Sequence, residues 1–143
     1  MALRGLQLLV QVHPDLCRLV EDVGAQRDIQ VVQGARSIAD EQKAIDTGHS
    51  ALKDPTSSKH VIVPGIRDVA EAVDITPYPV NWMDLPALYP VNWMDLPAFK
   101  DMGAFVKERA ADLGIPILWG GDFRSLHDYD HFELVIPQAA EAP

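Results

Sequence analysis

The order of its apolar patterns constrains the fold of this chain more than any other feature of the sequence. Three stretches carry apolar residues at helical spacing, and they cover Leu6–Val23, Ala39–Thr47 and Leu96–Leu113. Short β-branched or apolar runs predict strands at Ile29–Val32, Ala72–Ile75, Ile115–Trp119 and Phe132–Ile136. Because helices cluster early and strands late, we expect an α+β fold in which about three helices pack on a small antiparallel sheet.

Local signals define the ends of two of these helices. Pro14 predicts the start of the first helix, and Gly24 predicts its end. The longest pattern stops at Gly114, and its apolar residues lie on one side, namely Phe99, Met102, Phe105, Val106, Ala110 and Leu113. A chain of 143 residues fits one domain, which we place at residues 1–143 with a flexible tail at 138–143.

A tandem repeat interrupts the pattern at residues 78–98. The ten residues Tyr78–Ala87 recur unchanged as Tyr89–Ala98, at an offset of eleven. Two copies are too few for a solenoid and four prolines exclude one continuous helix, so we interpret the repeat as a duplication inserted into a complete domain. One native pocket cannot hold both Trp82 and Trp93, so the extra copy predicts an exposed indole and self-association through this segment.

The net charge and the hydropathy of the chain argue against two classes of partner, nucleic acids and a membrane that the chain would span. Its 21 acidic and 12 basic residues give a formal net charge of −9, which argues against a nucleic-acid partner. No apolar stretch reaches the length of about 18 residues that a membrane span requires. The N-terminus lacks the apolar region of a signal peptide, so we expect synthesis in the cytoplasm without one.

Two histidines and one aspartate form a candidate metal site. His60 lies in a loop, Asp74 in the strand Ala-Val-Asp-Ile, and His131 next to the last strand pattern. Two imidazoles and a carboxylate suit catalytic zinc, which takes three protein ligands and keeps one position open. We therefore expect Zn²⁺ at the sheet edge. Asp68 is a competing carboxylate, and with five histidines in the chain spacing alone does not select the set.

Taken together, the motifs resemble those of a peptidase family. The family pattern runs Ser-x-His, a short insert, Ala-x-Asp, then an acid, two residues and His, and it is matched by Ser58, His60, Ala72, Asp74, Asp128 and His131. The family contains D-alanyl-D-alanine carboxypeptidases and dipeptidases, and the L-alanyl-D-glutamate endopeptidases used as phage endolysins. Trp-Gly-Gly-Asp-Phe and His-Phe-Glu-Leu look more like the endopeptidase branch. The resemblance covers roughly Gln33 to Val135 and includes Gly-Ala-Arg-Ser at 34–37.

The resemblance implies a zinc metallopeptidase that hydrolyses the L-Ala–D-Glu bond of peptidoglycan stem peptides. Such a protein is made in the host cytoplasm and acts on the bacterial cell wall. The resemblance assigns Asp128 as the base that takes a proton from the attacking water. It assigns Arg36 to bind a substrate carboxylate or the oxyanion. Ser58 hydrogen-bonds the substrate or, as an alternative, turns the loop that presents His60.

The neighbourhood of the last histidine leaves the identity of the base open. Glu133 is the rival base, because alternation along a strand puts it on the same face as His131. As an alternative, Glu133 does not act as the base but orients the His131 ring from outside the metal's own ligands. Asp130 is expected to point elsewhere, and His127 is expected to be an ordinary polar residue.

Two features depart from the family pattern, the tandem repeat and the spacing between two candidate ligands, and two other functions remain open. The spacing from His60 to Asp74 is longer than in the short form of the pattern, so Val61–Val69 is expected to loop out. A D-Ala-D-Ala carboxypeptidase or dipeptidase is the first alternative function. A non-catalytic, zinc-stabilised cell-wall-binding domain is the second.

Overall fold

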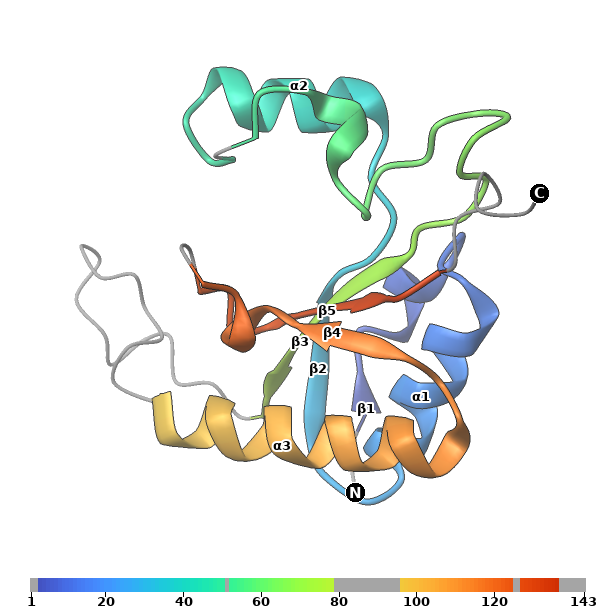
Figure 1. Cartoon of the computed structure of the whole chain (residues 1–143), viewed down its shortest axis with the longest axis vertical. Helices are drawn as coiled ribbons and strands as arrows, with labels where there is room; N and C mark the ends of the chain where they lie inside the picture. Colours follow the sequence, from blue (N-terminus) through green and yellow to red (C-terminus); the bar gives the residue numbers. More distant parts are fainter. Residues whose placement is uncertain (1–2, 51, 79–95, 125–126, 137–143) are drawn as a thin grey trace.

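The structure is a computed structural model that describes residues 3–50, 52–78, 96–124 and 127–136 (Figure 1). Most of the tandem repeat and the tail predicted at 138–143 lie outside the described residues. With η marking a 3-10 helix, the elements are β1 (Leu3–Arg4), η1 (Leu6–Leu9), α1 (Pro14–Gly24), β2 (Ile29–Gln33), α2 (Ile38–Asp46), η2 (Pro55–Ser57), β3 (Ala72–Pro77), α3 (Leu96–Leu113), β4 (Ile117–Trp119), η5 (Gly120–Asp122) and β5 (His131–Leu134).

The five strands form one sheet in the order β1-β2-β3-β5-β4. Strand β1 runs parallel to β2, and the other neighbouring pairs are antiparallel. The expected α+β class with three α-helices is therefore confirmed, whereas the sheet is mixed rather than purely antiparallel. The difference comes from β1, whose two residues are too few to give a periodic signal.

The boundaries of α3 agree with the predicted helix, but all four predicted strands have other limits, and β2 is one residue longer than expected. Strand β3 continues to Pro77, which pairs with Ile29 and sits at the strand end, where its missing N–H is tolerated. Strand β4 starts later than predicted because the N–H of Ile115 still bonds the carbonyl of Ala110, at the end of α3. Strand β5 starts at His131, which pairs with Asp74.

Helices α1 and α3 pack on each other and cover one face of the sheet (Figure 1). Helix α1 begins at Pro14, as predicted, and the ring of His13 caps it by accepting from the N–H of Asp15 at 3.0 Å. Both helices bury an apolar stripe, formed by Leu16, Leu19, Val20 and Val23 in α1 and by Phe99, Met102, Val106 and Ala110 in α3. Within the described residues, no helix has both the length and the apolar character needed to cross a membrane.

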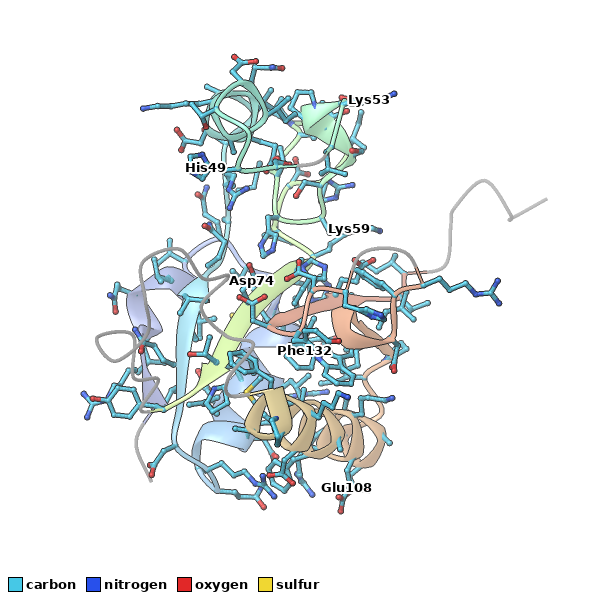
Figure 2. All side chains as sticks on the ribbon, turned by 90° about the vertical axis from the view of Figure 1, so that its left-hand side faces the viewer. His49, Lys53, Lys59, Asp74, Glu108 and Phe132 are labelled. Carbon is cyan, nitrogen blue, oxygen red and sulfur yellow. The ribbon has the colours of Figure 1, made fainter. Side chains whose placement is uncertain are left out.

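Strands β3 and β5, which are neighbours inside the sheet, have one apolar and one polar face. Their register pairs Val73 with Phe132 and Asp74 with His131. Val73 and Phe132 are buried in the core, and Asp74 lies on the side of the sheet nearer to α2 (Figure 2). Residues 38–57, which we call the upper lobe, stand apart from α1 and α3 and contain α2 and η2 in mutual contact (Figure 1).

Candidate metal centre

Antiparallel pairing of β3 and β5 brings Asp74 and His131 together. The two residues are direct partners in the register, so their side chains lie on the same face of the sheet. Nδ1 of His131 lies 3.1 Å from Oδ1 of Asp74. Strands β3 and β5 are inner strands, and the pair lies where β5 begins and where the pairing of β2 with β3 ends.

His60 reaches the same carboxylate from a tight turn outside the sheet. The turn is closed by a bond from the N–H of Val61 to the carbonyl of Ser58 at 3.1 Å. Nδ1 of His60 lies 2.9 Å from the carbonyl oxygen of Gly34, and Nε2 lies 3.1 Å from Oδ1 of Asp74. A carbonyl only accepts, so Nδ1 of His60 carries a hydrogen, and Nε2 faces the carboxylate of Asp74.

These three side chains form a compact set of metal-binding donors. The candidate ligand atoms of His60, Asp74 and His131 all lie within 4.8 Å of one another. The two imidazole rings meet edge to face with centroids 5.1 Å apart, and both histidines are buried. Within the described part of the chain, this is the one group of its kind. The competing Asp68 lies in another turn, where it accepts from the N–H of Gly65.

The charges at this cluster favour a bound cation. Burial opposes ionisation of Asp74, yet hydrogen bonds from His131 and His60 outweigh it and lower the pKa of Asp74 below its usual range. Burial also opposes protonation of His131, but the facing carboxylates of Asp74 and Glu133 raise its pKa to about 10. In the metal-free protein a proton thus lies between His131 and Asp74, where a divalent ion would supply positive charge instead. The donor set fits a metal ion.

Glu133 holds the opposite side of the His131 ring. Its Oε1 lies 2.8 Å from Nε2 of His131, two residues before it on β5. This arrangement matches the alternative in which Glu133 orients the histidine, since a ligating imidazole commonly donates its second N–H to a carboxylate.

Asp128 lies at the mouth of the same site, in a turn that precedes β5. Its carbonyl accepts from the N–H of His131 at 3.1 Å, and its N–H bonds the carbonyl of Gly120 at 3.0 Å. Only glycine fits at 120, because a Cβ there would come 2.1 Å from the Asp128 carbonyl oxygen. The Asp128 side chain is exposed and lines a cleft of about 650 Å³ over the metal cluster.

Asp130 also lines this cleft, contrary to the expectation that it points away. Burial, the charge of Asp74 and a hydrogen bond with Asp128 raise the pKa of Asp130 to about 9. The expectation assumed that the strand begins before Asp130. The observed strand begins at His131, so alternation does not apply to Asp130.

Arg36 approaches the cleft from the base of the upper lobe. One terminal nitrogen donates to Oε1 of Glu41 at 2.5 Å and the other to Oε1 of Gln33 at 2.9 Å. Glu41 is buried on α2, and its Oε2 has no hydrogen-bond partner among the described residues. In the sequence, Glu41 follows the Gly-Ala-Arg-Ser segment as part of the family resemblance, which gave it no role; it lies on the first turn of α2.

Ser58 and the upper lobe complete the walls of the cleft. The Ser58 hydroxyl accepts from the N–H of His60 at 3.2 Å, which fits the turn-forming alternative for this residue. His49, Ser50 and Leu52 line the cleft from the upper lobe, and Phe123 lines it from the side of β5. Figure 2 shows Asp74 and Lys59 between the lobe and the body of the sheet.

Comparison with known proteins gives consistent results. The sequence model of a family described as phage L-alanyl-D-glutamate peptidase matches residues 1–135. The L-alanyl-D-glutamate peptidase of Escherichia phage T5 is 32% identical over 105 residues, which are 71% of this chain. The match spans only 64% of that relative's length. The fold resembles the crystal structure of the Serratia marcescens L-Ala D-Glu endopeptidase ChiX, with a TM-score of 0.65, 24% identity and coverage of 92% of this chain and 90% of that one.

Proposed function

The chain belongs to the phage L-alanyl-D-glutamate peptidase family, and from this membership we propose that it is a zinc-dependent peptidase acting on bacterial peptidoglycan. The bond we assign to it is the one between L-Ala and D-Glu in the stem peptide. Its place of action is then the bacterial cell wall. The printed activity of the phage T5 relative supports the choice of bond.

The observation that carries this proposal is the convergence of His60, Asp74 and His131 on one wall of an open cleft. Three protein ligands with an open fourth position are typical of catalytic zinc rather than of closed structural sites. A bound zinc ion would polarise the scissile carbonyl and lower the pKa of the attacking water.

We assign the role of general base to Asp128. Its exposed carboxylate lines the cleft beside His131, so it can take a proton from the attacking water and pass it to the leaving amine. Glu133 then serves as the carboxylate that fixes the His131 ring, because its Oε1 is already 2.8 Å from Nε2 of that ring. The two carboxylates thus have different tasks.

Arg36 is the cation that we assign to substrate binding. Glu41 and Gln33 hold its two terminal nitrogens and fix the plane of the guanidinium at the cleft. A planar fork held in this way suits a substrate carboxylate or a developing oxyanion. Ser58 keeps its hydroxyl on the His60 turn, so its contribution is to shape the loop.

A digest of purified peptidoglycan tests the proposal. Mass spectrometry of the soluble products should reveal new N-terminal D-Glu, which should disappear in the presence of a chelator or in a His60→Ala variant. Release of free D-Ala instead would identify a carboxypeptidase or dipeptidase. Retention of zinc and of wall binding without any turnover would identify a non-catalytic wall-binding domain.

A further inference from the structure

The segment between two of the proposed metal ligands is a folded hairpin. Residues 61–69 were expected to loop out. In the structure the N–H of Val63 bonds the carbonyl of Arg67 at 2.9 Å, and the N–H of Arg67 bonds the carbonyl of Val63 at 2.7 Å. Gly65 adopts a φ of 80° at the tip, in open space, as a tight turn requires. The hairpin turns the chain back toward the His60 turn.

The hairpin places the side chain of Arg67 against the backbone of the turn that carries His60. One terminal nitrogen of Arg67 lies 2.7 Å from the carbonyl oxygen of Ser58 and 3.1 Å from that of Val61. It also lies 3.4 Å from the carbonyl oxygen of Thr56. The first two carbonyls flank His60 on either side, so one cationic group holds both ends of the turn.

Burial makes these contacts strong. The side chain of Arg67 is only 13% exposed, and Val61 is fully buried. Hydrogen bonds from a charged donor are stronger than neutral ones. A buried carbonyl that loses its donor destabilises the fold, because it has no water to bond instead. The positive charge is itself balanced by Glu71, whose Oε1 lies 3.5 Å from Nε of Arg67.

Glu71 connects this clamp to the sheet. Its N–H bonds the carbonyl of Lys59 at 2.8 Å, and its carbonyl accepts from the N–H of Leu134 on β5 at 2.9 Å. The turn that carries His60 is therefore tied to the strand that carries His131 through both the backbone of Glu71 and its ion pair with Arg67.

We propose that Arg67 is a positioning residue for His60, supplied by the long segment between His60 and Asp74. This inference rests on the metal centre proposed above and extends it to a residue that touches neither metal nor substrate. The bond from His60 to the Gly34 carbonyl sets the ring tautomer, while Arg67 fixes the backbone from which the ring projects. Without the clamp, Nε2 of His60 no longer has a fixed place relative to Asp74.

The test compares Arg67→Met with Arg109→Met in the full chain. Arg109 is a matched control because it is a partly buried arginine, bonded to Asp22 at 2.6 Å between α3 and α1, far from the cluster in sequence. Zinc affinity is measured by competition with a chelator, and thermal unfolding is measured without metal. We expect Arg67→Met to bind zinc about 10- to 100-fold more weakly, as for other residues that orient ligands. Arg109→Met should lower the unfolding temperature and leave the affinity unchanged.

A second readout does not depend on metal at all. Nitrogen NMR of the imidazole rings in the metal-free protein should show His60 as a single species with a hydrogen on Nδ1, bonded to the Gly34 carbonyl, and this signature should be lost in Arg67→Met. Equal zinc affinity in wild type and Arg67→Met, or an unchanged His60 signature, overturns the inference. If Arg67→Met does not fold, Arg67→Gln decides, and wild-type affinity in that variant overturns the inference too, since a shorter neutral side chain lacks the charged donor. If the wild-type protein binds no zinc, the proposed metal centre is refuted. The NMR comparison of His60 in wild type and Arg67→Met then still tests whether Arg67 positions His60.

Discussion

Oε1 of Glu133 lies 2.8 Å from Nε2 of His131, while the other ring nitrogen of His131 faces Asp74 at 3.1 Å. The histidine is thus held between two carboxylates on the same face of the sheet. Asp128, in contrast, has an exposed side chain at the cleft. This difference separates the two candidate bases by position and gives them distinguishable mutant phenotypes.

We expect Asp128→Asn to retain zinc and fold but to lose about 10²- to 10⁴-fold in kcat, because a general base typically contributes that much. Glu133→Gln should instead weaken zinc binding by about 10- to 100-fold, since it replaces the charged carboxylate that orients His131 with a neutral amide. Both are measured as turnover of a stem peptide and as zinc affinity. If Asp128→Asn stays near the wild-type rate while zinc-loaded Glu133→Gln is inactive, the two roles are reversed.

Alanine variants of the three proposed ligands should each lose the metal. In His60→Ala, Asp74→Ala and His131→Ala, metal analysis of the purified protein should find little zinc, because two remaining donors hold it poorly. Asp68→Ala is the control and should keep its zinc, since Asp68 accepts from the N–H of Gly65 in another turn. Full zinc content in His60→Ala or His131→Ala, or its loss in Asp68→Ala, would contradict the assignment.

Gly34→Ala should damage the metal site without touching a ligand. A Cβ at this position would come 1.8 Å from the carbonyl oxygen of Leu8, so the backbone must shift, and the Gly34 carbonyl that bonds His60 shifts with it. We expect a loss of about 1–3 kcal/mol in the free energy of unfolding, together with weaker zinc binding. Gly48→Ala is the control for zinc affinity. Its Cβ meets nothing within 4 Å, so the strain of its φ of 78° should lower stability and leave zinc affinity unchanged. Wild-type zinc affinity in Gly34→Ala would show that this carbonyl is dispensable.

Removal of one repeat copy should leave a folded, zinc-binding protein that is at least as active. Deleting residues 78–88 gives the same sequence as deleting 79–89, because both copies begin with Tyr-Pro. The contacts of Tyr78 are therefore kept, namely its N–H bond to the Asp28 carbonyl at 3.1 Å and the guanidinium of Arg4 over its ring. A surface insertion of this length costs little loop entropy.

Circular dichroism, zinc content and light scattering check this deletion. The shortened chain should self-associate less, if the second indole causes association as the sequence predicts. Unfolding of the shortened chain or loss of its metal would show instead that the repeat is structural.

Local patterns were sufficient to predict much of the scaffold. The apolar stripe from Phe99 to Leu113 predicted α3 with its observed ends, since helical periodicity and a terminal glycine are properties of the local sequence. In the same way, Pro14 marked the start of α1. The two-residue strand β1 could not be predicted, because it exists only through its pairing with β2.

The sequence by itself determined which residue types could hold a metal and that Asp74 lies in a strand. Only the tertiary structure decided which atoms converge. The β3–β5 register sets Asp74 opposite His131, and the hairpin at Gly65 returns Arg67 to the turn of His60. The tertiary structure likewise brings Asp130 and Glu41 to the cleft. The physical reason is that side-chain periodicity fixes direction only relative to a residue's own element, whereas contacts between distant residues depend on how the elements pack.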